Sequence, residues 1–304
     1  MKGLGVKRGR VVRVSGMQCL VDIDGEEWQC DVRGRLKEGP RQATSPVAVG
    51  DWVEVTFLNA PNGIVESVGP RRAKFSRAAS GSRPFEQIIA SNLDLLVIVV
   101  ALAQPVLRPG FIDRAIVMAL KGDIEPVVCI NKVDLDSEEK AHRIGNVYRQ
   151  LGYTVIYTSA KTGKGIERLE ALLNGRVSAL VGHSGVGKSS LLNAVDPSFS
   201  IKTQEMMRKH DRGRHTTTAV QLYRLDNDSY VVDCPGIKTL QLWQVDTTSL
   251  AEFFVEMVPL IGDCQFRDCT HLHEPGCAIR YNVEKGSIDT LRYQGYERIM
   301  ESLI

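Results

Sequence analysis

The sequence predicts an α/β chain in which a small β-barrel precedes a doubly wound parallel-sheet domain and a compact helical segment follows it. Three patterns support this: short alternating segments as far as about residue 68, continuous apolar runs between helical stretches in the middle, and a cysteine and histidine cluster near the end. A length of 304 residues suits two domains or three small ones. With 43% hydrophobic and 24% charged residues, the composition excludes a wholly disordered, collagen-like or coiled-coil chain.

The first part of the chain alternates polar and apolar residues in short segments separated by glycine. The segments expected to form strands are 11–14, 19–23, 27–32, 51–55 and 63–65. Alternation with a period of two, interrupted by a turn every roughly 8 to 12 residues, is typical of a small antiparallel barrel. We therefore expect an oligonucleotide-binding type barrel (OB-fold) over residues 1–69 and an extended basic linker over residues 70–84.

Residues 85–240 have the pattern of a parallel sheet covered by helices. The run from Leu93 to Ala101 is almost entirely apolar, as in strands that a parallel sheet buries on both faces. Asp136 and Glu139 are expected to form a capping box at the start of one helix. The other strands are expected at 127–130, 154–157, 177–181, 220–225 and 229–233, and the helices at 111–120 and 136–151. This alternation predicts a doubly wound α/β domain, and residues 241–304 are expected to be helical.

The strongest motif is the octapeptide GHSGVGKS, which follows an expected strand and precedes helical sequence. It fits the phosphate-binding pattern GxxxxGK[ST], in which glycines let successive backbone N–H groups point at phosphate oxygens. Lys188 is expected to reach the β- and γ-phosphates and the Ser189 hydroxyl to bind Mg²⁺. A glycine-rich turn without a ligand is the alternative, and the strand-loop-helix context disfavours it. The residues assigned to the phosphate site are Gly182, His183, Ser184, Gly185, Val186, Gly187, Lys188, Ser189 and Ser190.

A second motif, NKVD, predicts which base the site binds. Asp134 would accept hydrogen bonds from N1–H and the 2-amino group of guanine, donors that adenine does not present in this arrangement. Lys132 would cover the purine face, and Asn131 would connect this loop to its neighbours. Alone, the tetrapeptide would be an ordinary polar turn, but two further motifs accompany it.

These two motifs are TSAK at 158–161 and DCPG at 233–236. TSAK ends another expected strand, so a backbone N–H there would approach the carbonyl oxygen of the base. DCPG fits the pattern DxxG, in which Asp233 would hold a magnesium-bound water and the Gly236 N–H would meet the γ-phosphate. The residues assigned to the nucleotide from NKVD, TSAK and DCPG are Asn131, Lys132, Asp134, Ser159, Ala160, Lys161 and Gly236.

The four motifs resemble those of guanine nucleotide-binding proteins, but their order differs. Ordinary GTPases carry the phosphate loop first, then DxxG, NKxD and SAK, whereas here NKVD and TSAK precede GHSGVGKS and DCPG. All four loops are expected at the carboxyl ends of neighbouring parallel strands, where spatial rather than sequential adjacency makes the site. The sequence therefore predicts a circularly permuted P-loop GTPase domain.

Residues 198–219 lie between the phosphate-loop helix and DCPG and are long, basic and polar. A threonine near their end, which we assign as Thr217, would bind Mg²⁺ and the γ-phosphate in a first switch; an ordinary surface loop is the alternative. Ile237 stands where Ras-like enzymes keep a water-orienting glutamine, so intrinsic hydrolysis is expected to be slow. His215 is the candidate catalytic residue that orients water, and contact of His215 with RNA or solvent is an equal alternative.

Cysteine and histidine cluster near the end of the chain. Three thiolates and one imidazole match a closed tetrahedral Zn²⁺ site with a structural role and no vacant position for catalysis. The chain has an odd number of cysteines, seven, and no export signal, which favours a metal site over disulfides. The candidate ligands are Cys264, Cys269, Cys277 and either His271 or His273.

Basic residues concentrate at the front of the chain. Residues 1–84 hold 14 Lys and Arg against 9 Asp and Glu, and the basic residues at 2–13 and 71–83 flank the expected barrel. Such residues neutralise RNA phosphates, and a barrel face accepts RNA as OB-folds do. Solvated chain ends are the alternative.

Together, the permuted order, the barrel-like front, the sequence GRHTTT at 213–218 and the terminal cysteine and histidine cluster resemble the ribosome small subunit-dependent GTPase A (RsgA/YjeQ) family over nearly the whole chain. The resemblance implies an OB-fold, a permuted GTPase domain and a helical zinc domain with His271 as the imidazole ligand. It also implies a Mg²⁺-dependent GTPase that binds the small ribosomal subunit and its rRNA, is stimulated by that subunit, and assists its late maturation while converting GTP to GDP. We expect a monomer.

Two other functions are weighed against this one. Ile237 leaves open an RNA-binding guanine-nucleotide sensor without significant turnover, whereas Asp134 disfavours a metabolic P-loop kinase or ATPase. No run of about 18 apolar residues occurs, and the basic start has no apolar segment of a secretory signal behind it. We therefore expect a cytoplasmic protein without membrane contact.

Overall fold

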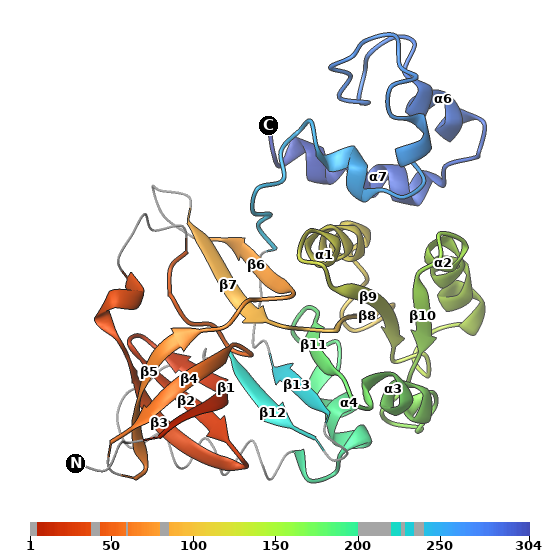
Figure 1. Cartoon of the computed structure of the whole chain (residues 1–304). Helices are drawn as coiled ribbons and strands as arrows, with labels where there is room; N and C mark the ends of the chain where they lie inside the picture. The colour runs from red at the N-terminus through yellow and green to blue at the C-terminus, as the bar shows by residue number, and fades with distance from the viewer. Residues whose placement is uncertain are drawn as a thin grey trace.

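The computed structural model describes residues 5–37, 43–58, 60–79, 85–199, 220–225, 229–233 and 240–304. Within them, a β-barrel, an α/β domain and a smaller helical domain follow one another along the chain (Figure 1). The barrel lies beside strands β12 and β13 of the α/β domain, and the helical domain lies over helix α1. Among the described residues, no helix combines the length and apolar composition needed to cross a bilayer.

Five strands form the N-terminal barrel. They are β1 (Val6–Ser15), β2 (Gln18–Ile23), β3 (Glu26–Val32), β4 (Trp52–Phe57) and β5 (Asn62–Val68). Their order is β1-β2-β3-β5-β4, and β4 pairs with β1 to close the barrel. Alternate apolar residues such as Val11, Val21, Val55 and Val65 are fully buried, so the period-two pattern supplies the barrel core. The predicted small barrel is confirmed, with a 3-10 helix (Gly34–Lys37) after β3.

The segment expected to be an extended basic linker contains a strand instead. Strand β6 (Lys74–Ala78) pairs antiparallel with β7 (Glu86–Ser91) as a separate two-stranded sheet. The physical reason is Phe75, which is fully buried in the largest hydrophobic core and holds this segment against the α/β domain. The arginines before it are also engaged, since Arg71 makes a bidentate ion pair with buried Asp51 at 2.7 Å.

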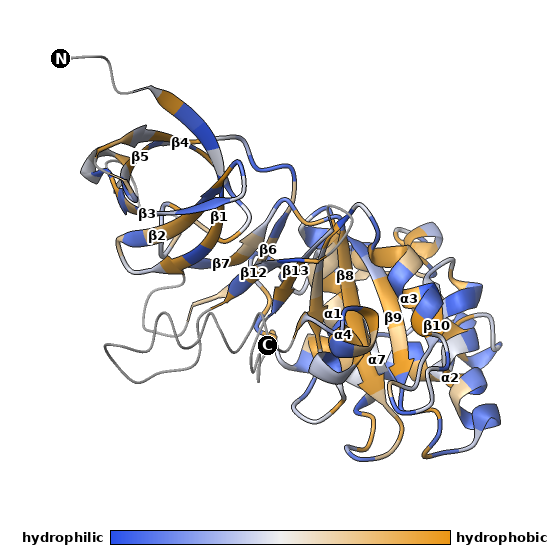
Figure 2. Cartoon of the chain, turned by 90° about the horizontal axis from the view of Figure 1, so that it is seen from below, coloured by the Kyte–Doolittle hydropathy of each residue, from blue (hydrophilic) through white to orange (hydrophobic). Residues whose placement is uncertain are grey.

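The α/β domain is a sheet with helices on both faces. Its elements are β8 (Leu95–Ala101), α1 (Pro109–Lys121), β9 (Glu125–Asn131), α2 (Glu138–Gln150), β10 (Thr154–Tyr157), α3 (Ile166–Leu173), β11 (Val177–Val181), α4 (Lys188–Val195), β12 (Gln221–Arg224) and β13 (Tyr230–Asp233). The order is β10-β9-β8-β11-β13-β12, and the first five strands are parallel. Helices α1 and α2 pack on one face and α3 and α4 on the other. Figure 2 shows the central strands as the most apolar part, as a sheet covered on both faces requires.

Helix α2 begins one residue later than the expected capping box. The cap is Ser137, whose side chain accepts a hydrogen bond from the Lys140 N–H at 3.2 Å. Asp136 instead accepts hydrogen bonds from the Ser137 N–H and the Lys140 ammonium group. Serine and aspartate are both good capping residues, so the sequence alone does not decide whether Asp136 or Ser137 caps the helix.

The barrel continues the sheet of the α/β domain. β12 runs antiparallel to β13 and also meets β1, with Arg13 opposite Gln221, so eleven strands form one continuous sheet. Arg10 of β1 reinforces this junction, because its guanidinium lies 4.8 Å from the Tyr230 ring of β13. The barrel is therefore attached to β12 and β13, and β13 ends at Asp233, the first residue of DCPG.

Two 3-10 helices (Leu250–Phe253 and Val258–Leu260), α6 (Ala278–Glu284) and α7 (Thr290–Glu301) make up the C-terminal domain. Helix α7 packs on α1 of the α/β domain. At the centre of this contact, the Arg292 guanidinium is buried, pairs with Asp113 of α1 and with Glu256, and lies 4.4 Å from the Phe254 ring. A buried charge is tolerated only when it is paired, so this cluster holds the two domains in one relative position.

Candidate functional site

The phosphate-loop motif forms a turn between β11 and α4. Gly185 and Gly187 have positive φ angles of 84° and 97°, which glycine adopts without strain. A side chain at Gly182 would overlap the Val99 carbonyl oxygen, and one at Gly187 would overlap the Asn131 amide. Three glycines of the motif are therefore required by the backbone path of this loop.

The loop surrounds a positively charged group. The Lys188 ammonium group donates hydrogen bonds to the carbonyl oxygens of Gly182 at 2.8 Å and of His183 at 3.3 Å, so it lies folded over the loop. No acidic residue lies in the first turn of α4, where Ser189 and Ser190 are exposed. A helix N-terminus preceded by a glycine turn and a lysine favours the binding of an anion.

Asp233 lies next to this loop. It ends β13 opposite Leu180 of β11, the strand that leads into the phosphate loop. Burial raises the pKa of the Asp233 carboxyl, and the positive charge of Lys188 opposes this shift. A carboxylate beside the phosphate loop fits the magnesium role predicted for Asp233, since Mg²⁺ prefers oxygen ligands and retains waters.

Asn131 connects three of the predicted loops. Its amide nitrogen donates to the Val186 carbonyl oxygen of the phosphate loop at 2.8 Å, and its amide oxygen accepts from the Thr158 hydroxyl of the TSAK turn at 3.0 Å. The side chain is 2% exposed, so both bonds are shielded from water. The buried amide thus joins NKVD, TSAK and GHSGVGKS into one unit.

Asp134 and Ser159 form the part of the site assigned to the base. The Ser159 hydroxyl donates to Asp134 at 2.6 Å, and this hydrogen bond lowers the pKa of the Asp134 carboxyl. Asp134 is otherwise exposed. Its carboxylate is hydrogen-bonded to Ser159 and can still accept hydrogen bonds from two N–H groups of a bound base. Lys161 is exposed and Ala160 partly exposed at the same turn, where their N–H groups lie at the carboxyl edge of the sheet.

Sequence reasoning missed a fifth loop at this edge of the sheet, the segment after β8. The Lys132 ammonium group donates to the Gln104 carbonyl oxygen at 2.6 Å. Pro105 lies near the phosphate loop, where its Cδ would be 3.8 Å from a Cβ on Gly185. No motif marks this loop, but the topology does. β8 lies between β9 and β11, the strands that precede NKVD and the phosphate loop, so the loop after β8 must lie at the same edge of the sheet.

Four predicted residues lie outside the described part of the chain. They are His215, Thr217, Gly236 and Ile237. Their assigned roles in water orientation, magnesium binding and γ-phosphate contact therefore stay predictions.

The cysteine and histidine cluster has the geometry of a metal centre. The ligand atoms of Cys264, Cys269, His271 and Cys277 all lie within 4.8 Å of one another. His271 Nδ1 lies 3.5 Å from the sulfurs of both Cys264 and Cys277, and these two sulfurs are 3.9 Å apart. Bonds of about 2.3 Å to sulfur and about 2.0 Å to nitrogen in a tetrahedron require separations of about 3.5 and 3.8 Å. The separations among His271, Cys264 and Cys277 therefore match those around a tetrahedral metal ion, and Cys269 lies close enough to be the fourth ligand.

The surroundings of the cluster hold its ligands in place. Backbone N–H groups of Ala278 and Arg280, at the start of α6, donate to the sulfurs of Cys264 and Cys277 at 3.4 and 3.5 Å. The Tyr293 hydroxyl of α7 donates to the His271 carbonyl oxygen at 2.6 Å. Such outer contacts orient metal ligands before the metal binds.

The fold and the four loops define a circularly permuted P-loop GTPase. The RsgA GTPase family model matches residues 68–243. A small ribosomal subunit biogenesis GTPase RsgA of Moorella thermoacetica is 38% identical over 97% of both chains, and one of Christiangramia forsetii is 35% identical over 97% of this chain and 96% of the relative. The chain belongs to the RsgA GTPase family.

Two solved structures share the whole architecture. YjeQ from Thermotoga maritima has a TM-score of 0.75 and 33% identity, covering 98% of this chain and 99% of its own. YloQ, described as a circularly permuted GTPase, has a TM-score of 0.72 and 26% identity, covering 99% of this chain and 96% of its own. The predicted fold class and family are thereby confirmed.

Proposed function

We propose that this protein is a Mg²⁺-dependent GTPase that binds the small ribosomal subunit, is stimulated by it, and assists its late maturation. The observation that carries the GTPase part is the Asn131 amide, which joins a guanine-type carboxylate turn to a phosphate loop. The ribosomal part rests on the names of the relatives, which are small ribosomal subunit biogenesis GTPases and match nearly the whole chain.

In this mechanism the phosphate loop and Lys188 neutralise the β- and γ-phosphates, while Asp134 selects guanine by accepting two hydrogen bonds. Ser189, Thr217 and Asp233 would hold Mg²⁺, which would supply positive charge to neutralise the phosphates. No glutamine follows DCPG, so we assign the orientation of water to His215 when the subunit is bound. Slow turnover without the subunit follows from this assignment.

The C-terminal cluster is proposed to hold one structural Zn²⁺ ion. Three thiolates and an imidazole leave no open position for a reacting group. The ion would fasten residues 264–277 to α6 and α7, because the ligands are connected to both helices by hydrogen bonds. We propose that the protein acts as a monomer.

RNA contact is proposed for the barrel face that carries Arg8 and Trp52. The Arg8 guanidinium lies 4.6 Å from the Trp52 ring, and both side chains are exposed. A stacked cation and aromatic ring offers a base a π-face and a phosphate a charge. Arg71 and Arg72 contribute less, since they are paired with Asp51 and Asp94.

The proposal is tested by measuring phosphate release from GTP with and without purified small subunits. We expect strong stimulation by the subunit and weak activity with ATP. Intact GTP binding without stimulated turnover would favour the alternative, an RNA-binding guanine-nucleotide sensor. His215→Ala is expected to bind GTP normally and to lose the stimulation, and unchanged stimulated turnover would reject the role of His215.

The RNA part has a separate test in the salt dependence of subunit binding. Neutralising Arg8 by Arg8→Gln is expected to reduce the slope of log affinity against log salt by up to about one unit. Arg143→Gln, an exposed arginine of α2, is the matched control. Equal slopes for wild type and Arg8→Gln would reject this face as an RNA contact.

A further inference from the structure

The turn that carries His271 also contains a carboxylate, Glu274, which is not one of the four clustered ligands. One of its oxygens accepts from the Thr270 N–H at 2.8 Å and from the Thr270 hydroxyl at 2.5 Å. The other accepts from the N–H groups of Leu272 and His273 at 3.1 and 3.2 Å. An ionised carboxylate offers about four lone-pair positions, so these donors leave Glu274 none for a metal ion.

The four hydrogen bonds enclose a strained residue. His271 has a φ angle of 62°, in the left-handed region that residues other than glycine rarely adopt. Such a conformation is unfavourable by itself and persists only where neighbouring contacts fix it. The donors to Glu274 belong to the residue before His271 and to the two residues after it, so the carboxylate fixes the turn on both sides of the strained position.

The path of this turn decides where the imidazole lies. His271 is 6% exposed, and its Nδ1 lies 3.5 Å from the sulfurs of Cys264 and Cys277. The side chain of His273, only two residues further along, is exposed. A change in the turn would therefore move the imidazole of His271 relative to the two sulfurs.

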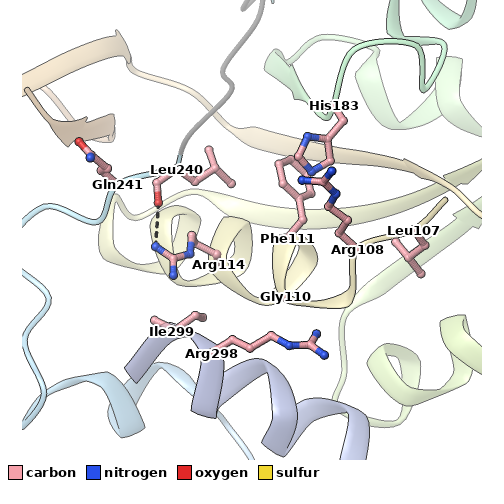
Figure 3. A pocket seen from close by; sticks show the side chains of 10 residues that line it. All are labelled: Leu107, Arg108, Gly110, Phe111, Arg114, His183, Leu240, Gln241, Arg298 and Ile299. Carbon is pink, nitrogen blue, oxygen red and sulfur yellow. Dashed lines mark hydrogen bonds between the residues drawn. The ribbon is translucent and has the colours of Figure 1, made fainter. Parts of the chain in front are cut away.

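Helix α7 holds the other side of the same turn. The Tyr293 hydroxyl donates to the His271 carbonyl oxygen at 2.6 Å, and the Tyr296 hydroxyl donates to the Thr270 carbonyl oxygen at 2.9 Å. The helix is itself packed on α1, and Figure 3 shows the end of this contact beside a cavity of about 630 Å³ that both helices line. The turn is therefore held between a docked helix and the Glu274 carboxylate.

The Glu274 carboxyl is ionised at neutral pH. Burial opposes its ionisation, but the hydrogen bonds from Thr270 and from backbone N–H groups outweigh burial and lower the pKa of Glu274 to about 2. A charged acceptor forms stronger hydrogen bonds than a neutral one. An amide in its place would keep one acceptor oxygen and turn an NH₂ donor toward two of the four donors.

We propose that Glu274 is a positioning residue of the metal centre, whose carboxylate fixes the turn that presents His271 to the metal ion. This inference rests on the Zn²⁺ site of the proposed function and adds to it a residue that does not contact the metal. Removing such a contact typically weakens metal affinity about 10- to 100-fold. A residue that only stabilised the fold would leave the metal affinity of the folded protein unchanged.

The experiment measures Zn²⁺ affinity in the full chain. Metal-free protein is saturated with Mg²⁺ and GDP, so that the nucleotide site is filled, and then competes with a chromophoric chelator for Zn²⁺. We expect the dissociation constant for Zn²⁺ to rise about 10- to 100-fold in Glu274→Gln. Asp268→Asn is the matched control, because it removes one negative charge from an exposed side chain next to the ligand Cys269. It should change the affinity less than about threefold, since exposed charges are screened by solvent.

Two further measurements separate positioning from other roles. Thr270→Val removes one of the four hydrogen bonds with little change of shape and should raise the dissociation constant about fivefold. Co²⁺ in place of Zn²⁺ reports the ligand set, because its absorption depends on how many thiolates bind it. At saturating Co²⁺ the spectrum of Glu274→Gln should match that of wild type, since the four ligands are the same.

Each outcome decides the proposal. Unchanged Zn²⁺ affinity in Glu274→Gln, or an equal loss in Asp268→Asn, would overturn it. A changed Co²⁺ spectrum at saturation would identify Glu274 as a ligand and would also overturn it. GDP affinity shows whether each variant is folded, and if Glu274→Gln does not fold, unchanged affinity in Thr270→Val would overturn the proposal. A wild-type chain that binds no Zn²⁺ would reject the zinc site together with this inference, whereas equal affinity of wild type and Glu274→Gln would reject the inference alone.

Discussion

The buried amide of Asn131 allows a sharp test of how the permuted loops are held together. Asn131→Ala removes its hydrogen bonds to the Val186 carbonyl oxygen and the Thr158 hydroxyl. The Thr158 hydroxyl keeps a neighbour in the Cys129 sulfur at 3.3 Å, whereas no other side chain is shown to donate to the Val186 oxygen in the described residues. The orphaned Val186 oxygen costs about 1 to 3 kcal/mol and the lost hydrogen bond to Thr158 about 1 kcal/mol, so the expected loss of unfolding free energy is about 2 to 4 kcal/mol.

Nucleotide affinity should fall as well, because GDP binds only the ordered loop. If about 1.4 kcal/mol of this loss comes from the weaker fixation of the phosphate loop, the dissociation constant for GDP rises about tenfold. Fluorescent GDP titration gives the affinity, and urea unfolding gives the stability.

Thr158→Val is the matched comparison, since it removes the contacts of the Thr158 hydroxyl with Asn131 and with the Cys129 sulfur but keeps the bond between Asn131 and Val186. It should cost about 1 to 2 kcal/mol of stability and change GDP affinity less than threefold. The reasoning is refuted if Asn131→Ala is destabilised yet binds GDP as tightly as wild type, or if both variants lose equal affinity.

Three further changes have defined outcomes. Asp134→Asn places an amide donor where two guanine donors must be accepted, so GTP affinity should fall about 100-fold, from the loss of about 3 kcal/mol of charged hydrogen bonding, while xanthosine triphosphate binding improves; competition titrations measure both. His271→Ala should lose the bound zinc and lower the unfolding temperature, whereas His273→Ala should keep the zinc, as metal analysis and calorimetry would show. Arg292→Ala leaves Asp113 and Glu256 buried without their partner and should cost about 3 to 5 kcal/mol in urea unfolding; a cost below about 1 kcal/mol would contradict the role of this ion pair.

Much of the fold could be predicted from the sequence because its signals are local. Alternating valines predicted the barrel, and continuous apolar runs predicted the strands that the parallel sheet buries. The same holds for the four loops, since each motif encodes its own backbone path and chemistry. Spatial convergence of the loops followed from one topological rule, that loops after parallel strands meet at the carboxyl edge.

What escaped prediction depends on contacts between distant residues. Phe75 turns a basic linker into a strand only because the α/β core covers it. Arg292 and Asp113 are separated by 179 positions, and neither belongs to a motif. Gln104 contributes a backbone oxygen, which leaves no trace in residue type. Sequence patterns report local conformation and side-chain chemistry. The burial of Phe75, the pairing of Arg292 with Asp113 and the backbone contact of Gln104 depend instead on tertiary contacts.

The contacts inside the site explain why the permuted order is tolerated. Asn131, at the end of β9, binds Thr158 in the loop after β10 and Val186 in the loop after β11. Lys132 binds Gln104 in the loop after β8. None of these bonds depends on which strand comes first along the chain, so the order can change while the site is kept. The order does decide what adjoins the site: the chain leaves β13 at Asp233 and enters the helical domain, whose α7 is locked to α1 by Arg292. Permutation therefore connects β13, which ends at Asp233 beside the phosphate loop, directly to the docked helical domain, a connection that the ordinary motif order would not create.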